Sequence, residues 1–471
     1  MLQSLGQLPM GWLLIALIAV FVSIAFFFGR IGAERLILAG APQLHSRPNY
    51  HGYFVAMWAA IPAGLVALAY GLGGESLARN LLVQELPPAF ELLSPAEMSV
   101  YLDSVSHAAT SRVPVTTDHV FTAVTNRYLE IRGNLNVWAL SLISFGAAAG
   151  IFWSRRRLSP VFRARTLVES GMEAMLFLCA AVAVATTAGI IASLLYESLQ
   201  FFRVVPIWEF LFGTRWNAQT EAEFGALPLF FGTFMIALIA MFVAAPIGLF
   251  SAIYLSEYAG PKVRAWVKPI LEILAGIPTV VYGFFALLVV APAVRSAAIW
   301  INETLVSVGI ASEPVLSAQP TSALAAGLVM GIMVIPFVSS LSDDVINAVP
   351  QTLRDGAYAL GATKSETVRH VVVPAALPGI IAALLLAVSR AIGETMIVVM
   401  AAGKSARISM DPTSDLTTIT VQIVSLMTGE TGFDDPKTLS AFALGLVLFA
   451  VTLLFNVIAL RVVQKYREKY D

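Results

Sequence analysis

The stretch from Pro350 to Ile381 is PQTLRDGAYALGATKSETVRHVVVPAALPGII, and it mixes charged and apolar residues between two long apolar runs. Leu353, Ala357 and Leu360 recur at helical spacing, which predicts a short helix with one apolar face. The proline that opens the stretch suits the first turn of a helix, where no backbone donor is needed. Gly361 follows the last apolar position and predicts the end of this helix.

A second short helix is predicted immediately afterwards. Thr363 and Glu366 have the spacing of a capping box, which satisfies the free amides at a helix start. We expect Pro374 to end this helix, because proline disrupts a helix interior. The result is two short helices at an angle between the apolar runs 323–341 and 376–402. A DNA-binding helix-turn-helix is the alternative, but the flanking runs restrict access and the basic residues are few for binding phosphates.

The composition is that of an integral membrane protein. Of the 471 residues, 58% are hydrophobic and only 13% are charged, whereas soluble domains have roughly a quarter charged residues. The single cysteine, Cys179, lies in an apolar run, so we expect no disulfide. The five histidines show no metal-ligand spacing, and we expect no metal, no cofactor and no catalytic residues. The first apolar run has no basic residues before it, and we expect no cleaved signal.

Nine apolar runs are long enough to cross a bilayer, which takes about 20 residues of helix. The predicted fold is therefore an all-α, polytopic helical bundle. The nine runs are 10–29, 52–73, 135–153, 172–196, 228–255, 270–293, 323–341, 376–402 and 438–461.

The basic residues predict an orientation. With the N-terminus outside, the inside segments hold 18 of the 29 Lys and Arg residues and the outside loops hold 10. Cytoplasmic loops of membrane proteins carry such an excess. We therefore expect a multi-pass protein of the bacterial inner membrane, with the segment 342–375 and the C-terminus in the cytoplasm.

The chain is predicted to divide near Ser170. Residues 1–170 hold three runs and a polar extracytoplasmic segment, 74–134, in which Ser94 and Glu97 form a second capping box. Residues 171–471 hold the other six runs. The segment 74–134 is either a spacer or a surface for a regulator or a binding protein, and the sequence leaves both open.

Two opposite charges lie within one apolar run. Arg390 and Glu394 are four residues apart, so a continuous helix would place them on one face. Burying such charges in a membrane is costly, and they usually mark a transport path. A structural ion pair that fixes helix packing is the alternative.

Three strings resemble a known family of transport proteins. The stretch 350–381 is similar to the cytoplasmic coupling loop of ABC-importer permeases, in which Asp355, Gly356 and Ala357 stand where the family usually has Glu-Ala-Ala. The string SRAIGETM at 389–396 resembles the RAxGETM signature of the PstC family, the permease subunits of phosphate-specific ABC importers. The string EILAGIPTVVYG at 272–283 supports the same family. The resemblance covers 171–471, and the first 170 residues are an extension that some longer members share.

The resemblance implies roles for particular residues. Arg390, Glu394 and Thr395 are expected to serve phosphate passage, since a guanidinium offers a planar fork of donors to phosphate oxygens. The loop 350–374 is expected to dock on an ATPase subunit as an amphipathic helix in a groove. Its expected coupling residues are Asp355, Gly356, Ala357, Leu360, Gly361 and Pro374.

The resemblance also implies partners. These are a PstA-like second permease, PstB-like ATPase subunits that hydrolyse ATP, and an extracytoplasmic PstS-like phosphate-binding protein. We expect contact with membrane lipid and none with nucleic acid. Two alternatives stay open, namely an ABC permease for another oxyanion and a self-sufficient secondary transporter with an Arg–Glu relay.

Overall fold

The computed structural model describes residues 10–38, 44–86, 90, 94–111, 119–218, 222–428 and 435–466. The chain forms two compact units, Met1–Ala185 and Thr186–Asp471. The division falls within the long helix α6 (Ala164–Val204), in whose first turns lies Ser170, the boundary that the sequence suggested. Each unit is described by itself below.

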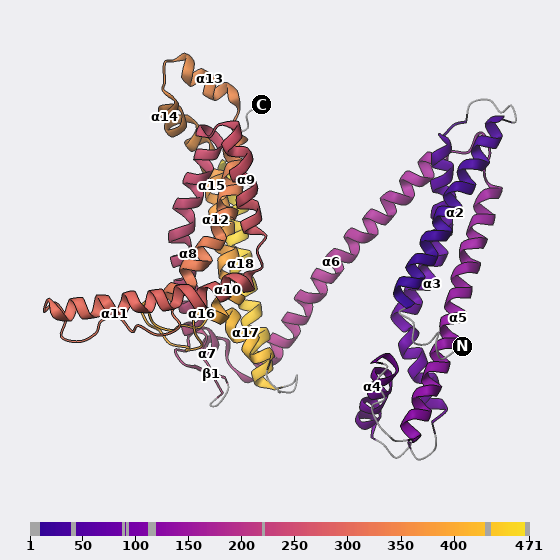
Figure 1. The fold of residues 1–471 in the computed structure, drawn as a ribbon, viewed down its shortest axis with the longest axis horizontal. Helices are drawn as coiled ribbons and strands as arrows, with labels where there is room; N and C mark the ends of the chain where they lie inside the picture. The colour runs from indigo at the N-terminus through magenta and orange to yellow at the C-terminus, as the bar shows by residue number, and fades with distance from the viewer. Residues whose placement is uncertain are drawn as a thin grey trace. The chain divides into compact units, whose positions relative to one another are not determined.

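The N-terminal unit is a bundle of three long helices, α2 (Met10–Leu38), α3 (Pro48–Gln84) and α5 (His119–Arg156), with the shorter α4 (Pro95–Ser111) packed at one end (Figure 1). Its core has one cluster around Phe54 and Val55 and another around Tyr128 and Leu129. At about 1.5 Å per residue, α3 and α5 are longer than a bilayer is thick. They therefore extend beyond the membrane, where α4 packs against them.

The described part of the predicted segment 74–134 is helical, while its residues 87–89, 91–93 and 112–118 lie outside the described ranges. Ser94 and Glu97 form the predicted capping contacts at the start of α4, at 2.9 Å from the Ser94 amide to the Glu97 carboxylate. Residues 120–131, also within this segment, form the first turns of α5. Arg79 of α3 binds Asp103 of α4 at 2.6 Å, which joins the two helices.

Acid should loosen the start of α4. The Ser94 amide and hydroxyl both donate to Glu97 and lower the pKa of its carboxyl below the ordinary value of 4.5. A lowered pKa stabilises the folded state above the unfolded pKa, and this contribution is lost as the pH falls through the folded pKa. We expect Glu97→Gln to remove that part of the acid dependence of unfolding, measured as melting temperature against pH from 3 to 7. An unchanged profile in the variant would contradict this role.

The C-terminal unit is built from elements that follow α6. In order they are α7 (Ile207–Phe212), β1 (Trp216–Asn217), β2 (Glu223–Phe224), α8 (Leu227–Ile253), η2 (Tyr254–Tyr258), α9 (Pro261–Ala275), α10 (Thr279–Phe285), η3 (Ala286–Val290), α11 (Ala291–Ser307), α12 (Ala323–Asn347), α13 (Gln351–Ala359), α14 (Lys364–Thr367), η4 (Val368–Val372), α15 (Val373–Ile392), α16 (Met396–Ala401), α17 (Ile419–Met427) and α18 (Pro436–Tyr466).

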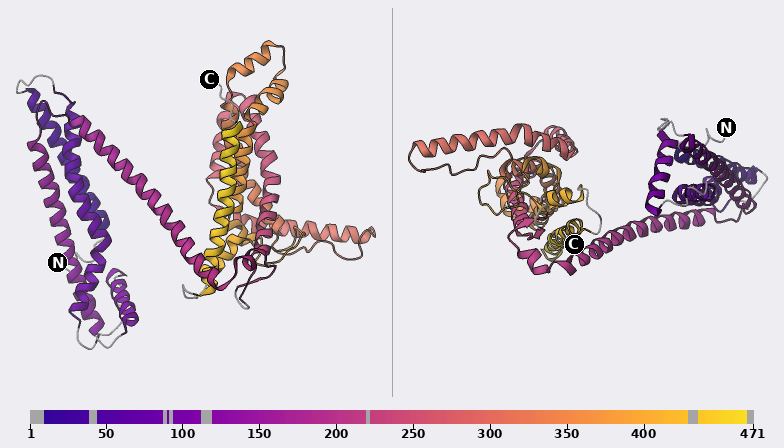
Figure 2. Two further views of the ribbon diagram at one scale, coloured as in Figure 1. Left: turned by 180° about the vertical axis from the view of Figure 1, so that it is seen from behind. Right: turned by 90° about the horizontal axis from the view of Figure 1, so that it is seen from below.

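Helix α12 lies at the centre of this unit. It packs along α8, and Gly331 lies against that helix so closely that a Cβ there would be 2.9 Å from the Ala240 carbonyl oxygen. Helix α15 packs on α12 and on α18, which runs the length of the unit (Figure 2). The main core cluster is formed by α8, α12, α15 and α16 around Met330 and Ile392. The two strands pair antiparallel, with Trp216 opposite Phe224.

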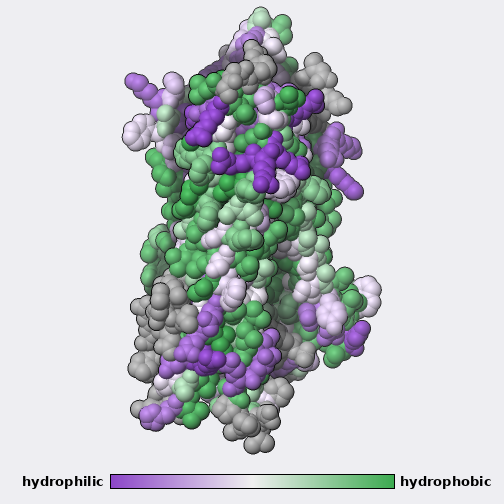
Figure 3. Space-filling model, turned by 90° about the vertical axis from the view of Figure 1, so that its right-hand side faces the viewer, coloured by the Kyte–Doolittle hydropathy of each residue, from purple (hydrophilic) through white to green (hydrophobic). Residues whose placement is uncertain are grey.

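The number of predicted spans is confirmed for the described residues, which contain nine helices long and apolar enough to cross a membrane. On the face shown in Figure 3, hydrophobic side chains form a broad band between more hydrophilic ends. The predicted span 270–293 is wrong in position. The run 270–293 is broken at Gly276-Ile277-Pro278, and the helical stretch is Thr279–Ser307. Residues 261–275 form the separate helix α9. Pro278 has no backbone N–H to donate within a helix, so α9 cannot continue through it.

The two elements of the predicted coupling loop protrude together from one end of the C-terminal unit. Helices α13 and α14 lie at the end where α18 also ends, while α16, α17 and β1 lie at the opposite end (Figure 1). The loop and the end of α18 therefore lie at the same end of this unit (Figure 1).

Candidate functional site

The predicted pair Arg390 and Glu394 does not share a helix face. Helix α15 ends at Ile392, and residues 393–395 are not helical. Glu394 instead caps the next helix, α16, by accepting a hydrogen bond from the Met396 amide at 3.0 Å. The continuous helix expected over 376–402 is therefore wrong, because a carboxylate that caps free amides stabilises a new helix start.

The break is also held from a distant part of the chain. The Thr420 hydroxyl of α17 donates to the Glu394 carbonyl at 2.8 Å. A discontinuous helix inside a membrane protein needs such partners for its free backbone groups. Thr395 lies in the break as well, with its hydroxyl 3.4 Å from the Gly393 carbonyl. Glu394 and Thr395 thus shape the end of α15.

Arg390 lies in the last turn of α15 and points into a cavity. Its guanidinium lies over the Phe337 ring, 5.5 Å from the centroid. Within the described residues Arg390 has neither an ion pair nor a hydrogen bond, so its donors are open to a ligand. Phe337 lies near the middle of α12, which places this cation well inside the span.

The cavity has a volume of about 310 Å³ and lies between α9, α12 and α15. This is many times the space of one water molecule, so a hydrated small anion fits. The wall contains apolar and polar groups and charges of both signs. The lining residues are Leu255, Lys268, Leu271, Glu272, Ala275, Met333, Pro336, Phe337, Ser339, Ser340, Asp343 and Arg390.

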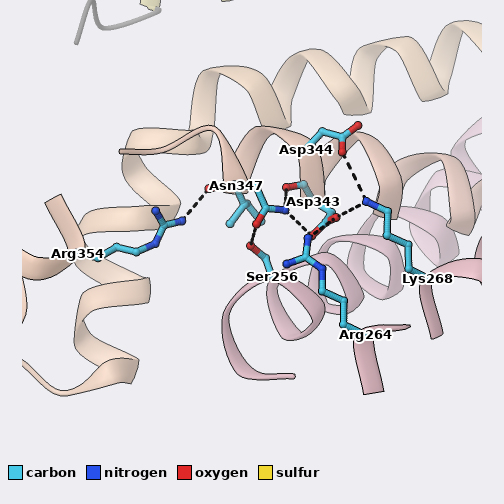
Figure 4. A network of polar contacts seen from close by, with 8 residues as sticks. Ser256, Arg264, Lys268, Asp343, Asp344, Asn347 and Arg354 are labelled. Atoms are coloured by element: carbon cyan, nitrogen blue, oxygen red, sulfur yellow. Dashed lines mark hydrogen bonds and ion pairs between the residues drawn. The ribbon is translucent and has the colours of Figure 1, made fainter. Parts of the chain in front are cut away.

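Asp343 is the centre of a polar network at one end of this cavity (Figure 4). Its side chain is only 4% exposed, and it accepts from Arg264 at 3.2 Å and from Lys268 at 3.0 Å, both on α9. Asn347 donates to the second carboxylate oxygen at 2.8 Å. Ser256 of η2 donates to Asn347 at 3.1 Å. One buried carboxylate thereby ties α9 and η2 to the end of α12.

A second buried pair anchors α13, the first helix of the predicted coupling loop. Arg354 binds Glu257 of η2 at 2.8 Å, and both side chains are at most 10% exposed. The same guanidinium donates to the Ile346 carbonyl at 2.9 Å, and so it also holds the last turn of α12. Such a pair is costly to break, because a lone charge would remain buried. These contacts join α13 to η2, which follows α8, and to the last turn of α12.

The other side of α13 faces outwards. Asp355 and Gly356 are exposed, Ala357 is half-buried, and Leu360 is 90% exposed. Leu353 packs against the core, so the sequence-based expectation of one apolar face that includes Leu360 is wrong. Leu360 is the C-cap residue, beyond the last helical turn, which explains why it leaves that face.

The turn between the two loop helices agrees with the sequence. Gly361 has φ +85°, a left-handed conformation that glycine adopts without strain. Thr363 and Glu366 form the predicted capping box of α14. Pro374 does not end this helix, however. The chain stays helical through Ile392, because the π-type turn η4 lies immediately before α15 and widens the helix where the proline ring enters.

Replacing Gly356 with alanine should stabilise α13 by about 1 kcal/mol, because glycine is a poor helix former. A Cβ at this position would meet nothing within 4 Å. The measurement is the melting temperature of the assembled complex, with Gly361→Ala as the matched control. We expect that control to destabilise, since its backbone is left-handed. Equal shifts in the two variants would contradict this interpretation.

Sequence reasoning missed the contribution of α9. Lys268 and Asp343 are 75 residues apart in the sequence. Both line the same cavity as Arg390. One signal was present, because Val263, Trp266, Ile270 and Ile273 follow helical spacing and define an amphipathic helix before Pro278. Its charged face packs towards α12, and its apolar face is exposed.

Nine apolar helices, a discontinuous helix with an unpaired arginine, and an exposed two-helix element, all within the described residues, are features of a membrane transport permease. Comparison with known proteins agrees. Residues 244–468 match the family described as binding-protein-dependent transport system inner membrane component. Residues 15–186 match a family described as phosphate ATP-binding cassette transporter.

Curated relatives show the same similarity. A phosphate transport system permease protein PstC of Mesorhizobium japonicum is 37% identical over 257 residues, which are 54% of this chain and 77% of that protein. PstC of Xylella fastidiosa is 35% identical over 298 residues, covering 62% and 90%. A probable ABC transporter permease, YqgH of Bacillus subtilis, is 33% identical over 280 residues, covering 59% and 85%. This chain belongs to the PstC family of ABC-transporter permeases, which are multi-pass inner-membrane proteins.

Proposed function

We propose that this chain is the permease subunit that conducts inorganic phosphate in an ATP-driven ABC importer. The observation that carries the proposal is the guanidinium of Arg390, which is unpaired among the described residues and lines a cavity inside the C-terminal unit. A cation at this depth is costly unless it serves a path. The names of the relatives and the family matched by residues 15–186 support phosphate as the anion.

Arg390 attracts the anion and offers a planar fork of donors to its oxygens. Glu394 keeps the end of α15 in place by capping α16, and Thr395 lies in the same break. Glu394 also moderates the attraction, since an ion that is bound too tightly does not leave. The site therefore binds phosphate briefly.

The coupling loop transmits the motion of the ATPase. Asp355, Gly356, Ala357, Leu360 and Gly361 form the outer surface of α13 and its end, which docks in a groove of a PstB-like ATPase subunit. Pro374, at the start of α15, lies on the far side of the loop and carries the movement into the span. ATP binding on the partner shifts the population between two states of the permease.

The assembly contains a PstA-like second permease, two ATPase subunits and a PstS-like binding protein on the outer face. In this arrangement the N-terminus lies outside and the C-terminus lies in the cytoplasm. ATP hydrolysis takes place on the partner chains. Residues 1–170 form an extension to the permease core at 171–471, and its segment 74–134 lies on the side of the binding protein.

The test is reconstitution of the assembled complex in proteoliposomes, with the binding protein and labelled phosphate outside. We expect accumulation only with ATP inside, and no competition from excess sulfate. Competition by sulfate would favour the alternative of a permease for another oxyanion. Uptake driven by an ion gradient with this chain alone would favour a secondary transporter, although Arg390 and Glu394 are not paired as that relay requires.

A further inference from the structure

We infer that Lys268 is a second cation for the transported phosphate, and that Asp343 is the carboxylate that holds Lys268 when phosphate is absent. Both residues lie at the coupling-loop end of the cavity that Arg390 lines. The inference rests on the proposed function, because it adds a second binding position to the same path.

The first argument is the position of the two cations along α12. Arg390 lies over Phe337, near the middle of this helix, whereas Lys268 binds Asp343 in its penultimate turn. Six residues of helix separate Phe337 from Asp343, which corresponds to about 9 Å. An anion that leaves Arg390 towards the coupling loop therefore meets Lys268 next, within one continuous cavity.

The second argument is that Lys268 can leave Asp343 without leaving a buried charge alone. Asp343 also accepts from Arg264 at 3.2 Å and from Asn347 at 2.8 Å, so its carboxylate stays paired and bonded. Lys268 is 37% exposed, and its other carboxylate neighbour, Asp344, is 3.8 Å away with a side chain that is 65% exposed and so stays solvated if Lys268 moves. The Lys268 ammonium is a compact charge on a flexible stem with three donors. The cost of exchanging one carboxylate for a phosphate oxygen is correspondingly small.

The other groups in the wall are compatible with this anion. Ser340 is exposed in the cavity, and its hydroxyl has no partner in the described structure, so it can donate to a phosphate oxygen. Glu272 carries a negative charge four residues after Lys268. This carboxylate would repel a fully ionised anion. Inorganic phosphate, however, keeps a hydroxyl at neutral pH, and this hydroxyl donates a hydrogen bond to the Glu272 carboxylate.

The pairing with Asp343 explains how the ion departs. Conduction needs binding that is favourable enough to admit the ion and weak enough to release it, and several sites in sequence meet this need. When phosphate moves on, the carboxylate of Asp343 takes its place beside Lys268. Asp343 thus competes for the cation and prevents tight trapping.

The test is binding of labelled inorganic phosphate to the purified, nucleotide-free complex without the binding protein, together with uptake in proteoliposomes. A hydrogen bond to a charged group contributes about 1.5–3 kcal/mol, so we expect Lys268→Gln to weaken binding by about tenfold or more. Lys268→Arg should restore most of it. Lys262→Gln is the matched control, since Lys262 is exposed on the same helix outside the cavity, and it should bind like the wild type.

Asp343→Asn should have the opposite effect. Without its competitor, Lys268 should bind phosphate several-fold more tightly, and maximal uptake should fall because release is slower. A purely structural role of the cluster would instead impair both variants in the same direction. Wild-type phosphate binding in Lys268→Gln, or weaker binding in Asp343→Asn, would overturn the inference.

Two further measurements distinguish the transported ion from a lipid headgroup, and the role of Lys268 from that of Arg390. The first compares phosphate binding in nanodiscs of zwitterionic lipid with binding in nanodiscs that contain phosphatidylglycerol. Equal binding in the two supports the transported ion as the ligand of Lys268. Loss of binding with the anionic lipid would assign the site to a lipid phosphate. If Arg390→Ala lacks uptake while Lys268→Gln is normal, only this inference fails. If Arg390→Ala transports normally, the proposed role of Arg390 fails.

Discussion

Replacing Arg390 with alanine should abolish phosphate uptake while the complex still assembles. The substitution removes the unpaired guanidinium from the cavity between α9, α12 and α15, and with it the positive charge that attracts an anion. No buried carboxylate is left without a partner, because Arg390 forms no ion pair with any described residue. We therefore expect little change in stability and a loss of uptake of at least about 100-fold, since each hydrogen bond to a charged group contributes about 1.5–3 kcal/mol and a guanidinium offers several donors to phosphate.

The measurement is uptake of labelled phosphate in proteoliposomes, with subunit stoichiometry determined by gel filtration. Arg295→Ala is the matched control, because Arg295 lies on α11, outside the cavity. Arg390→Lys should retain part of the activity, since it keeps the charge and loses the planar fork. Normal uptake in Arg390→Ala would remove this residue from the transport path.

Replacing Arg354 with methionine should destabilise the complex and uncouple ATP hydrolysis from transport. Arg354 and Glu257 form a buried ion pair at 2.8 Å that joins α13 to η2. Removing one partner leaves an uncompensated buried charge, which costs about 3–5 kcal/mol. Because the same guanidinium holds the Ile346 carbonyl of α12, α13 should then move without carrying the spans with it.

The readouts are the melting temperature and the ratio of phosphate transported to ATP hydrolysed. The double variant Glu257→Leu with Arg354→Met leaves no charge of this pair uncompensated, and we expect it to regain most of the stability. It should not regain coupling, since an apolar contact lacks the directional bonds to α12. An Arg354→Met complex with wild-type melting temperature and transport ratio would contradict the proposed linkage.

The sequence predicted what depends on neighbouring residues. The capping boxes at Ser94 and Thr363 were recognised because each is made within four residues, and Gly361 because its turn needs a left-handed residue. The resemblance to the family also rests on short strings of neighbouring residues. Two of the errors concern proline and glycine. Pro374 was expected to end a helix that continues, and the run around Gly393 was expected to continue where it breaks.

The break could not be predicted locally. A run of apolar residues gives the same periodicity whether or not Glu394 caps a new helix, and the choice depends on Thr420, which binds the Glu394 carbonyl from 26 residues away. The pairing of Arg390 with Glu394 was inferred from their spacing alone. That spacing has no meaning once the helix ends at Ile392.

By itself, the sequence determined the number of spans and the two-helix element between them, because a bilayer demands about 20 apolar residues and caps are formed within one turn. Only the tertiary structure decided which charges meet. Lys268 reaches Asp343 across 75 residues, and Arg354 reaches Glu257 across 97. Such pairs leave no periodic signal, because they depend on which helix faces pack together.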